Sequence, residues 1–417
     1  MRSLSSQIAS IRSQAQEHHT IISSDCHAGL PAEKYRDYVD PKFRDMFDMA
    51  LPIQTEMTDM AERVFLLKEI NDEWRAPIQD QLTGAYDYEQ RIKVLDGDGI
   101  AAEVIFPDGI TEQNAPPFGA GLTMPTKDIM PEAQWAGARA HNRWLAELVA
   151  NNPLRHFGVG LVPVLWDIDE AVKEVRWCSE NGLNGVLLPL LTGDKESYHH
   201  PKYDPFWQIC EDLGVVVCFH SGPAPMEDYY GQMFPMGNID NYPGAVGIFI
   251  SEVFFWTYRP LVFMAWGGVF ERFPKLKASV TETGQGFLLP PLLKMLDHHY
   301  HDTHFSAKLG DYRTHLSMSP TDYFKRNCAI GASCMPRADV EMRHQMGLDQ
   351  LMWGSDYPHP EGTWPHTAKE LKDAFTGFPV DDVAAILGGN AGRFYNFDMD
   401  GLKDVAKKVG PLKSDFE

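Results

Sequence analysis

The chain has 417 residues, 44% of them hydrophobic, so it can form one large domain with insertions or two medium domains. Its formal net charge of −21 argues against a nucleic acid or membrane partner but not against a small anionic substrate. Six cysteines without a CxxC pair predict reduced thiols in a cytoplasmic enzyme. We expect neither a secretion signal nor an apolar run long enough to span a bilayer.

Short apolar or β-branched segments alternate with helical segments along the chain. We predict eight strands, over residues 20–24, 100–106, 156–164, 185–191, 215–220, 261–266, 276–281 and 350–355. Alternation of strands and helices predicts a parallel sheet, and eight units favour closure into a (β/α)8 TIM barrel. No GxGxxG motif follows the first strand, which disfavours an open doubly wound sheet.

Three of the connections are long. Residues 30–98 carry prolines and acidic side chains and predict an inserted subdomain after strand 1, because such insertions build substrate pockets over the barrel mouth. Residues 112–127 and 223–242 predict long rim loops. Residues 20–398 then form a single barrel domain, and the charged residues 399–417 form a C-terminal tail that serves as an appendage or contact arm.

Four candidate metal ligands lie at the ends of predicted strands. Asp25 and His27 are two residues apart, so they share one face of an extended strand while Cys26 points away. His220 ends the fifth predicted strand and Asp356 follows the last. Since the carboxyl ends of barrel strands share one mouth, these side chains can bind one divalent cation. Taken singly, the aspartates also fit helix N-caps and His220 fits a core histidine.

Further residues are candidates for catalysis. Asp356 is placed to act as the base for a metal-bound water. Glu282, at the end of the seventh predicted strand, can be a metal ligand, an acid/base group or a partner that orients a ligand histidine. His359 follows Asp356 closely and is placed to contact substrate. We expect Cys26 to be a buried wall residue, and the histidines of residues 298–304 to form a solvated helix face.

Several segments resemble the amidohydrolase-2 family of the amidohydrolase superfamily, over about residues 21–397. They are the Asp-x-His pair, His-Ser-Gly after strand 5, GGVFERFPKLKASVTETGQGFLLPPLLKMLD, DYFKRN, MWGSDYPHPEGTWP and ILGGNAGRFY. The resemblance implies a (β/α)8 barrel with one or two divalent ions, and a family of hydrolases and non-oxidative decarboxylases of aromatic carboxylates. The family's ligand positions match the four candidate ligands named above.

This sequence departs from the family pattern in three places. Many relatives have a histidine where Asp25 stands, and a histidine at the end of strand 6, where we align Trp266. Strand 4 ends in Pro189 without a bridging lysine. The missing histidine of strand 6 and the missing lysine of strand 4 weaken a two-zinc hydrolase of the usual pattern, and we expect Glu282 to complete the site. The oxygen ligand Asp25 favours Mn, Fe or Zn without deciding between them.

We predict a metal-dependent hydrolase acting on a small organic substrate through a metal-activated water. The alternatives are a non-oxidative decarboxylase of a carboxylate, a non-haem metal oxygenase, and an inactive partner subunit of a hetero-oligomer. The cofactor is one or two Zn, Mn or Fe ions per chain, and we expect a homo-oligomer, a dimer or larger. A substrate carboxylate has three candidate cationic partners, Arg259, Arg272 and Lys325.

Overall fold

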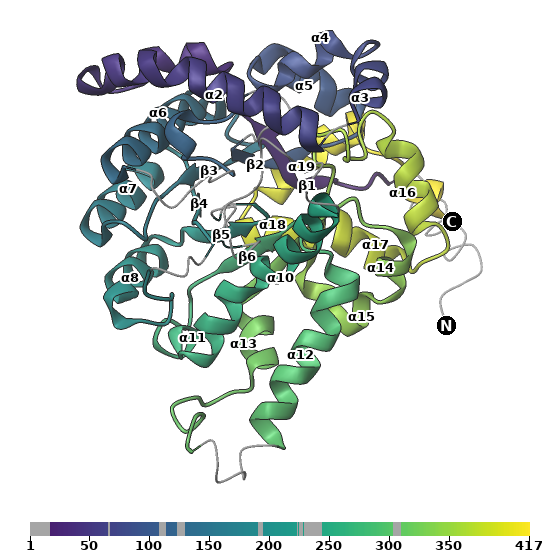
Figure 1. Ribbon diagram of the computed structural model, residues 1–417. Coiled ribbons are helices and arrows are strands. Elements are labelled where there is room, and N and C mark those ends of the chain that lie inside the picture. The colour runs from purple at the N-terminus through teal and green to yellow at the C-terminus, as the bar shows by residue number, and fades with distance from the viewer. Residues whose placement is uncertain are drawn as a thin grey trace.

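The computed structural model describes residues 17–65, 67–107, 114–122, 130–190, 195–222, 224, 228, 244–302 and 310–417. Eight parallel strands follow one another in chain order around a barrel, with helices outside (Figure 1). They are β1 (Ile22–Ala28), β2 (Ala102–Pro107), β3 (His156–Leu161), β4 (Gly185–Leu187), β5 (Val216–His220), β6 (Ala278–Thr281), β7 (Cys328–Ser333) and β8 (Leu351–Gly354). The predicted (β/α)8 barrel is confirmed.

Alternation along the strands divides the core into two parts. Val104 and Phe106 of β2 belong to a cluster inside the barrel, whereas Ile105 between them packs under the surrounding helices. The outer helices are α6 (Pro131–Ala150), α7 (Ile168–Glu180), α8 (Asp204–Leu213), α10 (Ala245–Trp266), α11 (Val269–Arg272), α12 (Gln285–His301), α13 (Pro320–Asn327), α14 (Arg337–Glu341), α15 (Arg343–Met346), α16 (Thr367–Phe375), α17 (Val380–Ala384) and α18 (Asn390–Tyr395).

The seam between β8 and β1 closes the barrel with few backbone hydrogen bonds. The amide of His27 donates to the carbonyl of Tyr357 over 2.7 Å, and the amide of Asp356 donates to the carbonyl of Asp25 over 2.8 Å. These two bonds lie at the carboxyl ends of the strands. The seam therefore fixes the candidate ligands of β1 beside the candidate ligand that follows β8.

One predicted strand is wrong, and one observed strand has no predicted counterpart. Residues 261–266 form the end of helix α10, because a short apolar run does not distinguish a buried strand from a helix segment. The observed β7 has the small-residue sequence CAIGAS, and a Cβ on its Gly331 would lie 2.7 Å from the hydroxyl of Thr281. The predicted seventh strand is consequently β6, so Glu282 follows the sixth strand and Trp266 ends no strand.

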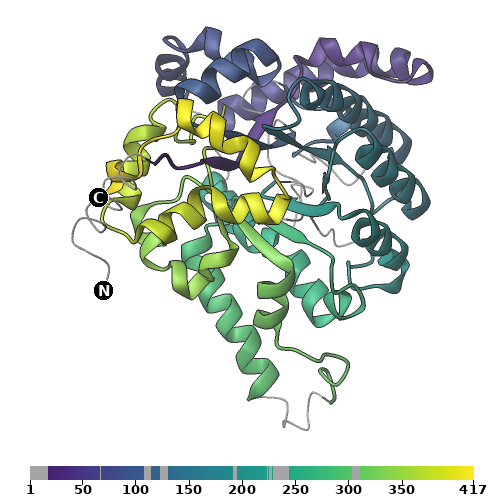
Figure 2. The same cartoon turned by 180° about the vertical axis from the view of Figure 1, so that it is seen from behind.

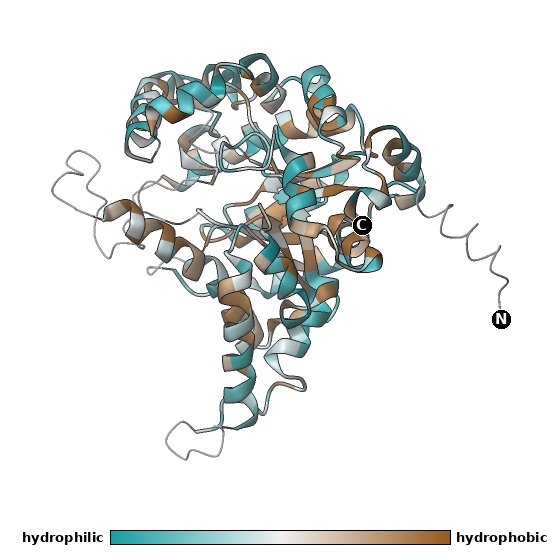
Figure 3. Cartoon of the chain, turned by 90° about the vertical axis from the view of Figure 1, so that its right-hand side faces the viewer, coloured by the Kyte–Doolittle hydropathy of each residue, from teal (hydrophilic) through white to brown (hydrophobic). Residues whose placement is uncertain are grey.

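Helix α10 also corrects the expectation that no apolar run is long enough to span a bilayer. Its 22 residues include an 18-residue window of mean hydropathy 1.3, of which 28% is buried, so length and composition alone meet that criterion. Figure 3 shows hydrophobic residues along much of this helix. Val253 and Tyr258 on its inner face are buried, and the Tyr258 hydroxyl donates to Thr283 just beyond β6.

The insertion after β1 is helical. It contains the 3-10 turns η1 (Ala32–Asp37), η2 (Pro41–Phe43) and η3 (Thr83–Ala85) and the helices α2 (Arg44–Phe65), α3 (Lys68–Arg75), α4 (Gln79–Leu82) and α5 (Tyr88–Gly97). These helices lie together along one side of the barrel, at the top of Figure 1. The two expected rim loops are described only in part: residues 114–122 of the first, and residues 224 and 228 of the second.

The C-terminal tail is part of the folded barrel rather than an appendage. It forms α19 (Met399–Val409) and the 3-10 turn Lys413–Phe416. Leu402 and Ala406 of α19 join the cluster inside the barrel, and Phe416 packs against His19. Seen from behind, the yellow C-terminal helices lie in front of the barrel (Figure 2).

Candidate metal centre

Four of the predicted site residues converge at the carboxyl ends of the strands. Asp25, His27, His220 and Asp356 are all at most 1% exposed. The Nε2 atoms of His27 and His220 each lie 3.4 Å from Oδ1 of Asp25. Nε2 of His27 also lies 3.2 Å from Oδ1 of Asp356. Side chains from β1, β5 and the turn after β8 thus meet at one point of the mouth.

Main-chain carbonyls orient both imidazole rings. Nδ1 of His27 lies 3.0 Å from the carbonyl oxygen of Pro107, and Nδ1 of His220 lies 2.9 Å from that of Ser221. A carbonyl only accepts, so each Nδ1 carries the proton and a neutral ring points the Nε2 lone pair at the carboxylate of Asp25. Two facing lone pairs repel unless a proton or a metal cation lies between them. This is the orientation that metal-ligating histidines usually have.

Several buried polar atoms of the cluster make no hydrogen bond. They are Nε2 of His27 and both carboxylate oxygens of Asp356. Such atoms are rare in folded proteins because burying an unpaired polar group costs free energy. Imidazole nitrogens and carboxylate oxygens are suitable donors for Zn, Mn or Fe. The donor set therefore fits a divalent cation, with Asp25, His27 and His220 in one group and His27, Asp356 and His359 in another.

The charges of the cluster favour a positive charge at its centre. Although burial opposes protonation, the carboxylates of Asp25 and Asp356 raise the pKa of His27 to about 10. Burial opposes ionisation of Asp25 as well, but His220 and His27 hold the pKa of its carboxyl well below the usual range. A divalent cation bound at Nε2 of His27 would take the place of this proton, so metal binding would release it.

The backbone is strained where two of the acidic side chains leave their strands. Glu282 has a φ of 55° and Asp356 a φ of 61°, in the left-handed region that residues with a Cβ seldom adopt. Strain of this kind costs about 1–3 kcal/mol per residue and is concentrated at functional sites. Here it occurs just after β6 and β8, where it directs both carboxylates toward the mouth.

Glu282 lies beside the cluster but in a more open position. Its side chain is 28% exposed, and Oε2 lies 3.6 Å from Nδ1 of His220 and accepts a hydrogen bond from the hydroxyl of Ser221. Partial burial raises the pKa of Glu282 to about 7, helped by the negative charges of Asp356 and Asp25 and opposed by His220. Trp266, which we aligned with the family's strand 6 histidine, instead ends α10 and packs on Tyr312.

Two residues of the loop after β8 extend the site. The ring of His359 stacks on that of His27 at 4.0 Å, and its Nδ1 lies 3.1 Å from Oδ1 of Asp356. Glu361, which the sequence analysis missed, has a carboxylate oxygen within 4.8 Å of those of Glu282 and Asp356. Its only signal in the sequence is its place in the segment MWGSDYPHPEGTWP.

Other residues considered from the sequence lie elsewhere. Arg259 covers the ring of Trp256 at 4.0 Å, Arg272 pairs with Asp204 at 2.8 Å, and Lys325 is exposed on α13. The histidines 298, 299 and 301 are exposed near the end of α12, which projects at the bottom of Figure 1; His304 lies outside the described residues. Cys26 is fully buried among residues of the insertion and the loop after β8, as expected.

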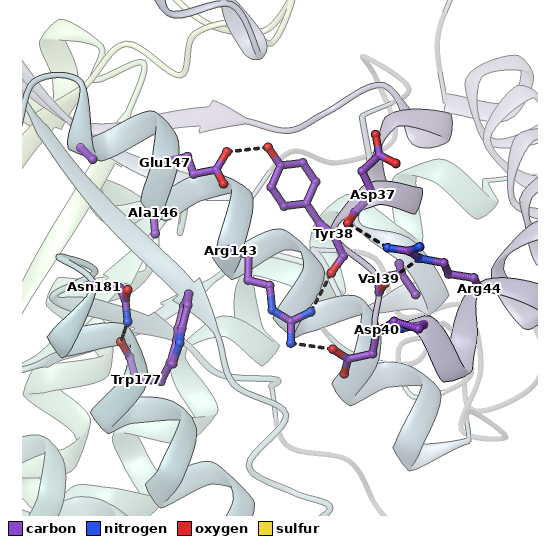
Figure 4. A pocket seen from close by; sticks show the side chains of 12 residues that line it. Asp37, Tyr38, Val39, Asp40, Arg44, Arg143, Ala146, Glu147, Trp177 and Asn181 are labelled. Atoms are coloured by element: carbon purple, nitrogen blue, oxygen red, sulfur yellow. Dashed lines mark hydrogen bonds and ion pairs between the residues drawn. The ribbon is translucent and has the colours of Figure 1, made fainter.

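Two grooves of about 700 Å³ lie away from this cluster. Figure 4 shows one of about 700 Å³ between residues 37–44 and helices α6 and α7. Several of its polar groups have partners within the groove: Arg143 lies 2.8 Å from Asp40, and the Tyr38 hydroxyl donates to Glu147 over 2.6 Å. This groove contains none of the predicted site residues.

Known proteins resemble this chain in sequence and fold. The Amidohydrolase family model (Amidohydro_2) matches residues 98–397, leaving the Asp-x-His pair outside. The 2-amino-3-carboxymuconate-6-semialdehyde decarboxylase of Dictyostelium discoideum is 24% identical over 317 residues, covering 76% of this chain and 78% of the relative. The gamma-resorcylate decarboxylase of Polaromonas sp. (strain JS666) is 24% identical over 283 residues, 65% of this chain and 76% of the relative.

A solved structure has the same fold. The dihydroxybenzoic acid decarboxylase from Polaromonas sp. JS666, with bound manganese and the inhibitor 2-nitroresorcinol, aligns with a TM-score of 0.61 at 19% identity. The alignment covers 92% of this chain and 99% of that chain. The family model spans well over half of the sequence and agrees with the barrel, so this chain belongs to the amidohydrolase family and is an enzyme of the amidohydrolase superfamily.

Proposed function

We propose that this enzyme is a non-oxidative decarboxylase of an aromatic or similarly unsaturated carboxylate. Both curated relatives described above are named as decarboxylases, which supports this alternative over hydrolysis, our leading prediction from the sequence. The residue pattern favours it as well, because residues 185–190, which form β4 and its end, contain no lysine that could bridge two ions, and the residue after β6 is Glu282 rather than histidine. The single observation that carries the proposal is the convergence of buried imidazole and carboxylate groups, three of whose atoms make no hydrogen bond, beside the partly exposed carboxyl of Glu282.

Four residues would hold a divalent ion: Asp25, His27, His220 and Asp356. With two carboxylates against a charge of +2, this ligand set is neutral overall and suits Mn, Zn or Fe. We place manganese first because the Polaromonas structure contains it. When bound, the ion supplies positive charge that attracts the substrate carboxylate and a neighbouring oxygen. His359 holds Asp356 in place through its contact at 3.1 Å.

The remaining step needs a proton for the carbon that loses carbon dioxide. The bond between the ring carbon and the carboxylate carbon breaks, carbon dioxide leaves, and a carbon–hydrogen bond forms in its place. Glu282 is placed to supply this proton because its carboxyl lies beside the cluster, is reached by solvent and is fixed at Oε2 by the hydroxyl of Ser221. Water then restores the proton of Glu282.

Product analysis tests the proposal. The protein is stripped of metal, reloaded with Mn, Zn or Fe, and incubated with hydroxy- and aminobenzoates in deuterated water. We expect release of carbon dioxide with one deuterium at the vacated carbon, only in reloaded samples. Incorporation of labelled water oxygen into an ester or amide substrate would support hydrolysis instead, and oxygen consumption would support an oxygenase. Either result without carbon dioxide release refutes the proposal.

A further inference from the structure

A buried arginine of the inserted subdomain reaches the back of the candidate metal centre. Arg91 of α5 is 0% exposed and donates from Nη1 to the main-chain carbonyl of His27 over 2.9 Å and to that of Gly84 over 3.1 Å. It also pairs bidentately with Glu103 of β2, at 2.6 Å from Nε and 2.8 Å from Nη2. One planar group thus joins the insertion, β1 and β2, and four of its five N–H bonds have acceptors.

The same side chain supports the other side of the barrel seam. Its guanidinium lies over the ring of Tyr357, 5.4 Å from the centroid, and Tyr357 directly follows Asp356. The Tyr357 hydroxyl donates to the carbonyl of Gln81 in the insertion over 2.6 Å. The carbonyl of Tyr357 accepts from the amide of His27. Arg91 therefore contacts both partners of a backbone hydrogen bond that closes β8 onto β1: the main chain of His27 and the ring of Tyr357.

The positive charge of Arg91 is matched by Glu103, so Arg91 does not serve to neutralise the carboxylates of the mouth. Glu103 also accepts from Nδ1 of His156 at 2.9 Å. Burial opposes ionisation of Glu103, but Arg91 and His156 hold the pKa of its carboxyl well below the usual range. What Arg91 adds to the centre is geometry. Its donation to the His27 carbonyl fixes the main chain that carries the imidazole, and its contact with Tyr357 restricts the turn that carries Asp356.

We propose that Arg91 is a positioning residue, through which the inserted subdomain sets the geometry and metal affinity of the centre formed by His27 and Asp356. The inference rests on the proposed metal centre. Lysine in place of Arg91 keeps the charge but loses the planar fork that bonds Glu103 and two carbonyls at once. Partners of this kind change metal affinity by about 10–100-fold when they are replaced.

Another buried arginine offers a matched control. Arg155 is 6% exposed, pairs with Asp96 at 2.7 Å and donates to the carbonyls of Ala101 and Ile100, both over 2.9 Å. It thus makes the same kinds of bonds as Arg91, but at the amino-terminal end of β2, away from the seam. Arg155→Lys reports the cost of replacing a buried arginine without disturbing the mouth.

The experiment compares manganese binding, the electron paramagnetic resonance spectrum of bound Mn²⁺ and the thermal midpoint in wild type, Arg91→Lys and Arg155→Lys. We expect Arg91→Lys to bind Mn²⁺ at least about 10-fold more weakly and with an altered spectrum. Arg155→Lys should lose a similar amount of thermal stability yet bind Mn²⁺ within about 2-fold of wild type. Equal affinity and spectrum in wild type and Arg91→Lys would overturn the inference, as would an equal loss in both variants.

A double variant guards against misfolding. Arg91→Met with Glu103→Gln removes both charges of the buried pair, which often restores stability. If Arg91 positions the centre, affinity stays low when stability recovers, because no donor reaches the His27 carbonyl. Recovery of affinity together with stability would show a general effect on folding. Failure of wild type to bind any ion would instead reject the proposed metal centre itself, so the two failures are distinguishable.

Discussion

Two clusters of buried ionisable groups differ in how their polar atoms are paired. In the cluster of Arg91, Glu103 and His156, every side-chain nitrogen and oxygen atom except Nε2 of His156 has a hydrogen-bond partner. In the mouth cluster, Nε2 of His27 and both oxygens of Asp356 have none, and carboxylates predominate. A self-satisfied cluster stabilises the scaffold, whereas an unsatisfied one is complete only with a ligand.

The largest effect that would sharpen this comparison is expected from Asp356→Asn. The amide keeps the shape but removes a negative ligand, so turnover should fall at least about 10²-fold. Thermal stability without added metal should change only modestly, because the amide keeps the shape of the side chain and its contacts with His27 and His359. Activity assays and thermal melts check both. Near-normal turnover by a folded Asn variant would contradict this difference between the clusters, since the carboxylate oxygens of Asp356 would then have no role in catalysis.

Glu282→Gln separates the roles left open for that residue. As the proton donor, Glu282 should be needed for turnover but not for metal binding, so we expect a loss of about 10²-fold in rate at constant metal content. Elemental analysis beside the activity assay decides between the roles. Loss of a metal equivalent would show ligation instead, and a wild-type rate with wild-type metal content would exclude both.

His19 tests whether an unpaired buried imidazole is enough to mark a metal site. Both of its ring nitrogens are buried without a hydrogen bond. Burial, aided by the positive charge of Lys413, lowers the pKa of His19 to about 4, so its imidazole is neutral at neutral pH. In the unfolded chain the pKa returns to about 6.5, so the unfolded state binds more protons between these values. Stability from this residue is complete above about pH 6.5 and is lost as the pH falls toward 4.

We therefore expect His19→Gln to lose less stability on acidification than wild type, by on the order of 3 kcal/mol between pH 6.5 and 4. Activity and metal content at neutral pH should not change. Denaturant melts at several pH values measure the difference. Parallel pH profiles would contradict the assigned pKa, and loss of metal in this variant would show that unpaired imidazoles outside the mouth also bind ions.

The smallest effect is expected from Cys26→Ser. Cys26 lies between two candidate ligands in sequence, but its thiol turns toward Ser23 at 3.1 Å and Ser355 at 3.3 Å. Burial raises the pKa of this thiol well above its usual value, which keeps it unreactive. The variant should keep most of its activity. A thiol reagent that abolishes activity by modifying Cys26 in metal-loaded protein would contradict this assignment.

The sequence predicted the four converging residues because strand ends and motif spacing are local signals. Glu282 was placed after the correct strand segment, but the strand was misnumbered because apolar LVFMAW belongs to a helix and CAIGAS to a strand. Arg91 and Ser221 could not be assigned from the sequence. Their contacts with His27 and Glu282 join segments 64 and 61 residues apart, and only the folded barrel brings these together.

Quantifying bound manganese tests the central claim most directly. Wild type, His220→Ala and the control His19→Ala are loaded at the same free Mn²⁺ concentration and analysed for metal. We expect about one ion in wild type and in His19→Ala, and several-fold less in His220→Ala, because one of about four ligands is lost from the mouth cluster only. Full occupancy in His220→Ala, or no bound ion in wild type, would contradict the assignment of the mouth cluster as the metal centre.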